Sequence, residues 1–336
     1  MPKALITDLS GPTLTDAEAR WLDEADPLGI ILFARNIKNP SQLVELTSSF
    51  RSVVGRPKAP VLIDQEGGRV ARLRAPHWWG GVAAGRIGAL PAGEAEEAAF
   101  LSARVMAADM AAMGVDVDCA PCLDLLVAGA NNVVGDRSFG ADPERVAALG
   151  QANVDGFLAG GVVPVIKHLP GCGRVRSDPH DVLPVIDCPL ETMAASDFKP
   201  FAAIEGMPWG MTNHAVYSAV DPDCVATLSA KVIADVIRGA IGFDGLLVSD
   251  ALDMDALSGS HAERARLAVA AGCDLAMHCN QPLDVRREVA DAVPELSNEA
   301  LRRLKAADAM RQAPDSAFDR QAALARLGEL VGEAVA

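Results

Sequence analysis

The feature of this sequence that most constrains its fold is a regular alternation of short apolar runs with amphipathic segments along the chain. The apolar runs have the length of buried strands and lie at 4–9, 29–34, 59–66, 115–125, 161–169, 210–217, 245–252 and 273–279. The intervening segments repeat apolar residues every three or four positions, as at 16–25, 41–54, 94–114, 143–161 and 229–242. Strands alternating with helices form parallel sheets, and eight such strands can close a barrel. We therefore predict an α/β fold, a single-domain (β/α)8 TIM barrel.

The domain organisation follows from the same pattern. A chain of 336 residues lies within the range of one-domain barrels. We predict that residues 1–312 form the barrel and that residues 313–336 form a C-terminal helical tail packed on it. A doubly wound open sheet is the alternative, but no G-x-G-x-x-G follows the first apolar run and no change in composition marks a second domain.

Composition restricts the partners. The formal net charge of −15 disfavours nucleic acid and anionic membranes, because both would be repelled without a strong local basic patch. The first residues lack a basic segment followed by an apolar one, and no uninterrupted apolar run approaches the roughly 18 residues of a membrane span. We expect a cytoplasmic protein that binds neither nucleic acid nor membrane.

The cysteines indicate reduced thiols. There are seven, an odd number, and they are scattered rather than framing a small domain. Cys119 and Cys122 form a C-x-x-C, but no second C-x-x-C or histidine pair completes a zinc motif. The pair also lies in an apolar run rather than at the start of a helix. We predict two packing thiols.

Polar residues follow almost every apolar run, where a TIM barrel carries its chemistry. They are Asp64, Glu66, Arg69, Arg72, Asp136, Arg137, Lys167, His168, Asn213, His214, Ser249, Asp250, Asp253 and Asp255. Helix caps and salt bridges can account for any one of them, and we predict that Asp253 and Asp255 begin the next helix. That explanation weakens for Lys167, His168 and Asp250 together, because their strands converge on one mouth.

The stretch "KHLPGCGRVRSDPH", residues 167–180, allows three interpretations: a metal site, an acid/base device or a polar loop without function. Barrel metallohydrolases usually take a His-x-His from the first strand, which here has no histidine; His168, His180 and His214 remain the alternative ligand set. A phosphate site is disfavoured because no glycine-rich anion cradle follows the last two strand runs. We predict no metal and no cofactor.

The acid/base interpretation explains more of the residues. Asp178 and His180 are two positions apart, close enough for the carboxylate to accept a hydrogen bond from one ring nitrogen. Such a carboxylate fixes the tautomer and favours the protonated imidazole near neutral pH. Asp250, which comes from another strand, can then serve as nucleophile or electrostatic stabiliser.

Four motifs resemble, in order and spacing, those of bacterial β-N-acetylglucosaminidases of glycoside hydrolase family 3. They are "IDQEGGRVAR", "GDRSFGADP", "KHLPGCGRVRSDPH" and "VSDALDM". "GIILFARNIKNPSQL" and "DVDCAPCLDL" are also similar to segments of that family, and the resemblance spans about residues 5 to 290.

The resemblance implies a retaining exo-glycosidase with a covalent glycosyl-enzyme intermediate, like the short single-domain enzymes of cell-wall recycling. It assigns Asp250 as nucleophile, His180 as general acid/base and Asp178 as its dyad partner. It matches sugar-binding positions to Asp64, Arg72, Arg137, Lys167 and His168. The implied substrate is N-acetylglucosamine linked to 1,6-anhydro-N-acetylmuramic acid, with or without a peptide, and we expect a monomer.

Two positions depart from the family pattern. Cys172 replaces a histidine, and Pro179 replaces a hydroxyl residue between the acid/base pair. Proline restricts the residue before it to extended conformations and removes a backbone donor, so it bears on how the loop moves. We interpret Cys172 as a small filler between two glycines.

Three alternatives to a hydrolase of this kind stay open on the sequence. A phosphorylase of the same family would use phosphate in place of water, and Arg174 and Arg176 could attract the anion. A zinc-dependent barrel hydrolase and a non-catalytic sugar-binding protein come from other classes.

Overall fold

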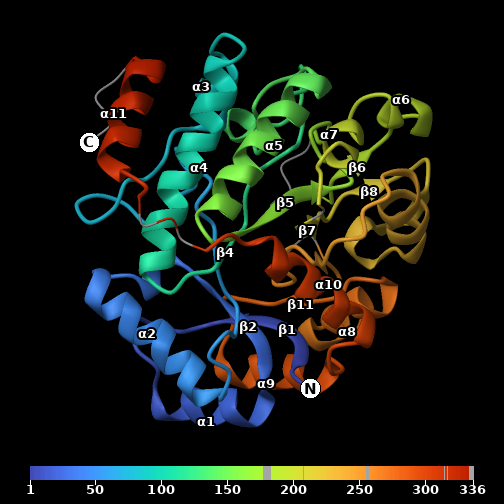
Figure 1. Ribbon diagram of the computed structural model, residues 1–336. Helices are drawn as coiled ribbons and strands as arrows, with labels where there is room; N and C mark the ends of the chain where they lie inside the picture. Colours follow the sequence, from blue (N-terminus) through green and yellow to red (C-terminus); the bar gives the residue numbers. More distant parts are fainter. Residues whose placement is uncertain (177–182, 207, 255–256, 314, 316, 333–336) are drawn as a thin grey trace.

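The computed structural model describes residues 1–176, 183–206, 208–254, 257–313, 315 and 317–332. Eight parallel strands form one sheet at the centre of the molecule (Figure 1). In their order round the sheet they are β10 (Leu247–Val248), β7 (Trp209–Thr212), β5 (Val163–Leu169), β4 (Val117–Asp118), β3 (Val61–Ile63), β2 (Pro27–Leu32), β1 (Lys3–Asp8) and β11 (Ala276–Met277). A parallel bridge between Val248 and Leu275 joins the two ends of the sheet, so the strands close into the predicted barrel.

Helices surround the barrel (Figure 1). They are α1 (Asp16–Ala25), α2 (Pro40–Val53), α3 (Ala84–Gly88), α4 (Glu94–Ala112), α5 (Pro143–Ala159), α6 (Leu190–Ala194), α7 (Lys199–Ala202), the π-type helix η4 (Val232–Ala240), α8 (His261–Ala271), α9 (Leu283–Ala292), α10 (Asn298–Met310) and α11 (Arg320–Val331). Short 3-10 turns are η1 (Ala34–Asn36), η2 (Gly135–Arg137) and η3 (Ala226–Leu228).

Local sequence explains where several helices begin. Thr15 accepts a hydrogen bond from the backbone of Glu18, whose side chain accepts one from the backbone of Thr15, so this reciprocal capping box starts α1. Asn39 and Asp142 cap α2 and α5, each directly before a proline at the first helical position. These local signals account for where the three helices begin.

A small second sheet lies beside the barrel. One of its strands comes from the segment between β5 and β7, and the other two come from the segment between β7 and η4. The sheet pairs β6 (Val185–Ile186), β8 (Val216–Tyr217) and β9 (Asp221–Val225). The predicted strand 210–217 is therefore wrong as a single element: β7 ends at Thr212, and residues 216–217 belong to the second sheet.

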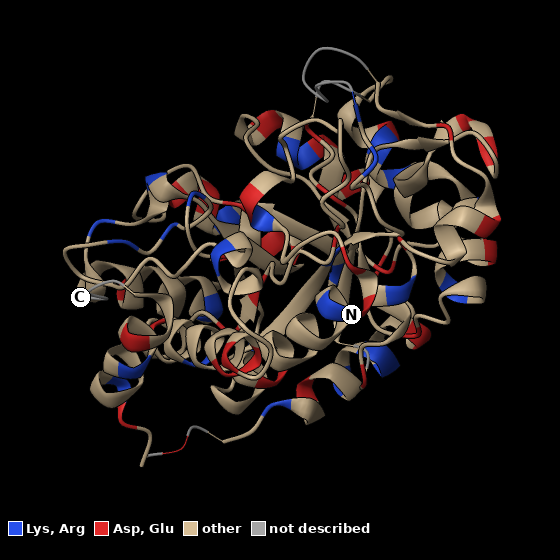
Figure 2. Ribbon diagram, turned by 90° about the horizontal axis from the view of Figure 1, so that it is seen from above, with Lys and Arg blue, Asp and Glu red and all other residues tan. Residues whose placement is uncertain are grey.

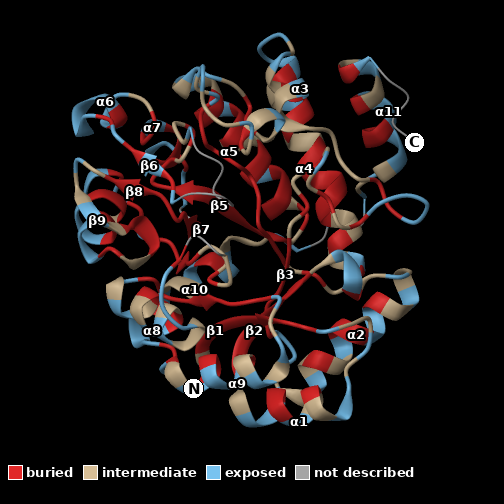
Figure 3. Cartoon of the chain, turned by 180° about the vertical axis from the view of Figure 1, so that it is seen from behind, coloured by how far each residue is buried: buried red, intermediate tan, exposed pale blue. Residues whose placement is uncertain are grey.

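The core lies in the barrel and on the inward faces of the helices, while the outward faces are exposed (Figure 3). Acidic and basic residues are interspersed over the outer surface (Figure 2). Two ion pairs join the C-terminal helix α11 to α4: Arg320 to Asp109 and Arg326 to Glu97, both at 2.8 Å. Among the described residues, no helix combines the length and the apolar character that crossing a bilayer would require.

The predicted fold class is confirmed, but most predicted strands are too long. The run 115–125 forms a strand only at Val117–Asp118. Pro121 has no N–H for a sheet ladder, so the segment after Asp118 stays beside β5 through an isolated bridge and single backbone hydrogen bonds, such as Leu123 N–H to the Lys167 carbonyl at 2.7 Å. The chain after β4 is thereby free to turn a carboxylate, Asp124, inward.

Candidate active site

The C-terminal ends of the barrel strands enclose a cavity of about 410 Å³. Its polar lining includes Asp64, Glu66, Arg72, Arg137, Lys167, His168, Asn213, His214 and Asp250. Six of these are the described members of the predicted site, and the structure brings all six together. Valine, methionine and phenylalanine side chains complete the walls, so the cavity combines apolar surface with convergent polar groups.

Lys167 is the centre of a buried charge network. Its Nζ lies 2.6 Å from Glu66 Oε1 and 3.0 Å from Asp64 Oδ1. Arg137 makes a bidentate pair with Glu66, with Nε and Nη2 each 2.8 Å from a carboxylate oxygen. Arg72 Nη2 donates to Asp64 Oδ2 at 3.2 Å. Two carboxylates and three cations therefore hold one another in fixed orientations.

Glycine permits the turn that brings these carboxylates to the cavity. Gly67, in "DQEGG", has a φ of +97°, and a Cβ there would lie 2.4 Å from Val82 O. Any other residue would be strained and would clash with the backbone.

Charge pairing keeps the network ionised despite its burial. Burial alone would raise the pKa of Glu66, but Lys167 and Arg137 together lower it well below its ordinary value. The pKa of Asp64 is also lowered, because Lys167 and Arg72 outweigh burial. Burial would lower the pKa of Lys167, but Glu66 and Asp64 raise it above its ordinary value. The fixed charges can therefore act as strong hydrogen-bonding partners for a ligand's hydroxyl groups.

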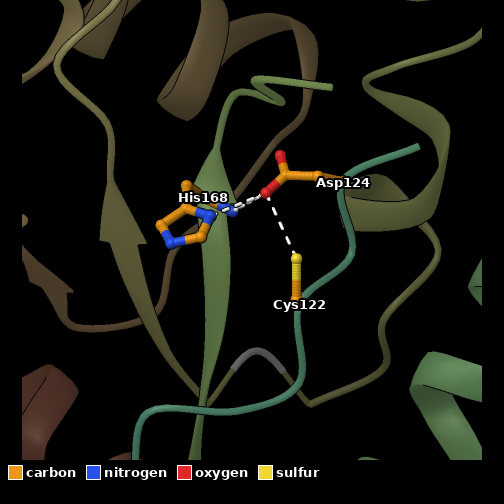
Figure 4. A group of neighbouring side chains, drawn as sticks. All are labelled: Cys122, Asp124 and His168. Atoms are coloured by element: carbon orange, nitrogen blue, oxygen red, sulfur yellow. Dashed lines mark hydrogen bonds and ion pairs between the residues drawn. The ribbon is translucent and has the colours of Figure 1, made fainter. Parts of the chain in front are cut away.

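Asp124 orients the ring of His168 through a hydrogen bond. His168 Nδ1 lies 2.6 Å from Asp124 Oδ2 (Figure 4), and its Nε2 lies 3.4 Å from Arg137 Nη2. Arginine can only donate, so in the neutral ring Nε2 is the acceptor and Nδ1 carries the proton. Burial would raise the pKa of Asp124, but His168 lowers it, so the carboxylate remains charged. Asp124 thus fixes both the tautomer and the ring plane.

Asp250 follows β10 and lines the same cavity. Its backbone N–H donates to Thr212 Oγ1 at 3.3 Å, and its Oδ1 accepts from the Ala251 N–H at 2.7 Å. Oδ2 has no hydrogen-bond partner among the described residues. One oxygen is therefore held in place while the other can react or bind.

Asn213 and His214 are framework residues. The Asn213 side chain donates to the His168 and Leu169 carbonyls at 3.1 and 2.9 Å, which supports the end of β5. The His214 ring nitrogens lie 2.9 Å from Thr227 Oγ1 and 3.0 Å from the Ala251 carbonyl.

Asp178, His180 and Pro179 lie outside the described residues. Upstream in the same loop, Arg174 pairs with the buried carboxylate of Asp197 at 2.8 Å. Since this guanidinium already has an internal carboxylate partner, Arg174 gives little support to the phosphate-attracting role that the sequence suggested.

One prediction about this mouth is wrong, and two residues were missed. Asp253 does not begin a helix: α8 begins at His261 with Ser260 as its cap, and Asp253 accepts a bond from Asn280 Nδ2 at 3.0 Å. Asp255 lies outside the described residues. Glu66 follows an apolar run but is not among the predicted site residues. Asp124 lies inside the run 115–125 that was expected to be a strand.

The metal interpretation finds different residues from those named on the sequence. His214 has both ring nitrogens engaged, and His180 lies outside the described residues. Within the described ranges, the side chains that could together hold a metal ion are Cys122, Asp124 and His168 (Figure 4). All seven cysteines are free thiols, and Cys119 and Cys122 are buried as predicted.

Comparison with known proteins gives consistent results. The family model described as the glycosyl hydrolase family 3 N terminal domain matches residues 5–309. A beta-hexosaminidase of Pseudomonas aeruginosa strain LESB58 is 37% identical over 309 residues, which cover 91% of this chain and 88% of that protein. One from Shewanella frigidimarina is 37% identical over 292 residues, with coverage of 84% and 83%.

Solved structures with a similar fold include enzymes of the same kind. NagZ from Neisseria gonorrhoeae, in complex with N-trifluoroacetyl-D-glucosamine, has a TM-score of 0.88 at 34% identity and covers 98% of both chains. A glycoside hydrolase family 3 beta-N-acetylglucosaminidase from Paenibacillus sp. str. FPU-7 has a TM-score of 0.86 at 28% identity, covering 98% of this chain and 67% of the other.

Proposed function

Because this chain belongs to glycoside hydrolase family 3 and is a β-N-acetylglucosaminidase, we propose that it releases terminal N-acetylglucosamine from peptidoglycan fragments by a retaining mechanism. The observation that carries the mechanism is the position of Asp250. Its carboxylate enters, from β10, the same cavity that the Asp64, Lys167 and Arg137 network lines from the other strands. A carboxylate that can act as a nucleophile and groups that can bind hydroxyls thus line one cavity, which supports the proposal.

In the first step, Asp250 Oδ2 attacks the anomeric carbon and forms a glycosyl ester. The bond from that carbon to the leaving oxygen breaks, and His180 protonates the oxygen. In the second step, neutral His180 takes a proton from water, whose oxygen attacks the anomeric carbon and frees the Asp250 carboxylate. Retaining glycosidases usually use two carboxyl groups, and His180 takes the place of one in this proposal.

The charge network would hold the sugar. Asp64 retains lone pairs for a hydroxyl donor, and Lys167 and Arg72 can donate to hydroxyl oxygens. Contacts of this kind raise the rate where they strengthen in the transition state. His168, held by Asp124, would orient a further hydroxyl.

The substrate proposal rests on the resemblance of the sequence motifs to those of short, single-domain enzymes of cell-wall recycling. We propose N-acetylglucosamine linked to 1,6-anhydro-N-acetylmuramic acid, with or without a peptide, as the substrate, a monomeric enzyme and a cytoplasmic location. Comparing kcat/KM for this disaccharide with that for chitobiose checks the proposal. A clear preference for chitobiose would contradict it.

The nucleophile is tested with a fluorinated, mechanism-based N-acetylglucosaminyl fluoride. We expect one sugar added per chain, mapped by peptide mass spectrometry to Asp250. Asp250→Ala should take up no label and lose turnover of an aryl N-acetylglucosaminide. A label on another residue, or full turnover in Asp250→Ala, would contradict the assignment.

A further inference from the structure

Cys122, Asp124 and His168 form a cluster (Figure 4), and His168 also lines the cavity. One sulfur, one carboxylate oxygen and one ring nitrogen all lie within 4.8 Å of one another. This mixture of soft and intermediate donors matches the ligands that Zn²⁺ and related cations prefer in proteins. We infer that these three residues bind a thiophilic divalent cation of the Zn²⁺ class and that its binding inhibits the enzyme.

The donor atoms are already convergent. Asp124 Oδ2 lies 2.6 Å from His168 Nδ1 and 3.3 Å from Cys122 Sγ. Asp124 is only 1% exposed, His168 8% and Cys122 3%. Such burial excludes the competing water ligands that weaken surface sites. Because Asp124 and Cys122 come from the segment after β4 and His168 from β5, the rigid barrel holds both sides.

Cys172 lies on the route by which the cation would enter from the cavity, and its sulfur can serve as a fourth ligand. Its Sγ lies 3.9 Å from His168 Nδ1, and its backbone N–H donates to Asp124 Oδ1 at 2.7 Å. Cys172 and His168 both line the cavity, whereas Cys122 is not among its lining residues. A cation entering from the cavity would therefore meet Cys172 and His168 before Cys122, and a rotation of the Cys172 side chain would complete a four-coordinate site.

Binding follows a balanced exchange of protons. Cys122 gives up its S–H proton to solvent, and its thiolate sulfur binds the cation. His168 binds through Nδ1, so the proton on that nitrogen moves to Nε2. Asp124 exchanges its hydrogen bonds from these two groups for the cation. One proton is released for each cation bound.

The inhibitory effect follows from the new tautomer and rests on the proposed function. A protonated Nε2 would face Arg137 Nη2, now 3.4 Å away, with two donors and no acceptor between them. Arg137 and His168 must then separate. Both are predicted sugar-binding residues, so occupancy of the cluster should weaken substrate binding.

Binding is tested directly on the full chain, after stripping with EDTA, by titration with Co²⁺ and Zn²⁺. We expect one Co²⁺ per chain with a thiolate-to-metal charge-transfer band, and its displacement by Zn²⁺. Cys122→Val leaves Cys172 as the remaining thiol of the site, so it should reduce the intensity of that band and weaken binding at least tenfold. Cys119→Val is the matched control, since this buried cysteine lies three residues earlier in the same segment, and it should bind as the parent does.

Several results would overturn the inference. These are equal affinity in Cys122→Val, a Co²⁺ spectrum without a thiolate band, or equal loss in the Cys119→Val control. A thermal melt shows whether each variant is folded, and Cys122→Ser gives a second, smaller change at the same position. Binding to folded Cys122→Ser as tight as that of the parent would place the cation elsewhere, including at the proposed His180 and Asp250.

Inhibition is measured separately, by comparing the KM of each variant in the presence of Zn²⁺ with the KM of the same variant in EDTA. Zn²⁺ should raise KM in the parent and in Cys119→Val, and much less in Cys122→Val. Stoichiometric binding without a change in KM would overturn the inhibitory role. Because the Co²⁺ spectrum does not require turnover, failure of the glycosidase proposal would leave the binding test intact.

Discussion

Lys167 Nζ lies 2.6 Å from Glu66 Oε1, and the two side chains are only 3% and 6% exposed. They come from β5 and from the turn after β3, strands separated by β4 in the sheet. An ion pair at this depth is stable only because both partners have further partners: Arg137 for the carboxylate and Asp64 for the ammonium. The Lys167–Glu66 pair, which lines the cavity, is thus also part of what holds the barrel mouth together.

Removing Glu66 should therefore destabilise the protein. Glu66→Ala leaves Lys167 and Arg137 buried with one fewer anion, and we expect a loss of about 3–5 kcal/mol in the free energy of unfolding. Urea unfolding near neutral pH measures it. Glu97→Ala, which breaks the exposed pair with Arg326, should have little measurable effect. Similar losses in both variants would contradict the importance of burial.

Asp124 should act by positioning His168 rather than by touching substrate. In Asp124→Asn, the amide can donate to Nδ1 and favour the wrong tautomer. We expect kcat/KM to fall by about one to two orders of magnitude, mainly through KM, since a lost ground-state contact raises KM. Steady-state kinetics check this. Asp197→Asn is the control: it changes another buried carboxylate, which pairs with Arg174, and it should leave KM much closer to that of the parent. A fall in kcat alone for Asp124→Asn would contradict the positioning role.

Local signals in the sequence predicted the architecture well because helix boundaries and buried runs depend on neighbouring residues. The helix expected at 16–25 is α1 (Asp16–Ala25), fixed by its own capping box. The strand expected at 115–125 ends at Asp118, because Pro121 has no N–H to donate to the ladder and Asp124 turns toward His168, although Leu123 N–H still donates to the Lys167 carbonyl.

The site was predicted less completely because its members depend on contacts between distant parts of the chain. Lys167 and Asp64 were expected at one mouth because both follow apolar runs. Asp124 carries no such signal, since its partner His168 is 44 residues away. A carboxylate that interrupts an apolar run two residues after a C-x-x-C was the available clue.

Asp250 should be required for chemistry, whereas its near neighbour should not. Asp250→Ala removes the proposed nucleophile, and turnover of an aryl N-acetylglucosaminide should fall by roughly 10³-fold or more. Asp253→Ala is the matched control, since it lies three residues later and bonds to Asn280. Equal losses in the two variants would point to a general effect of carboxylate removal on this loop.

His180 should matter most when the leaving group needs a proton. For His180→Ala, hydrolysis of an unactivated disaccharide should slow by about 10²–10⁴-fold, with a smaller effect on a nitrophenyl glycoside, whose leaving group departs without protonation. The pH dependence of kcat/KM assigned to the acid should also disappear. His77→Ala, at an exposed histidine, is the control. Equal slowing of both substrates would contradict the acid/base role.

His278 should make the protein sensitive to acid. It follows β11, is 1% exposed, packs edge-on against His261, and has no hydrogen-bond partner for either ring nitrogen among the described residues. Burial, with the nearby His261, Arg264 and Arg286, lowers the pKa of His278 from 6.5 to about 3. The folded protein therefore keeps this ring neutral while the unfolded chain binds a proton below pH ~6.5, so stability falls as the pH falls between these values.

Replacing this histidine isolates its contribution. Between pH 7 and pH 4 the parent should lose about 3 kcal/mol more than His278→Leu, because leucine takes up no proton in either state. Carboxylates with a lowered pKa, such as Glu66, add acid sensitivity of the same sign to both proteins, so the difference between them reports on His278. Urea unfolding of both proteins at several pH values gives that difference, with His77→Gln as the exposed control. Parallel stability curves for the parent and His278→Leu would show that His278 is protonated alike in the folded and unfolded chain.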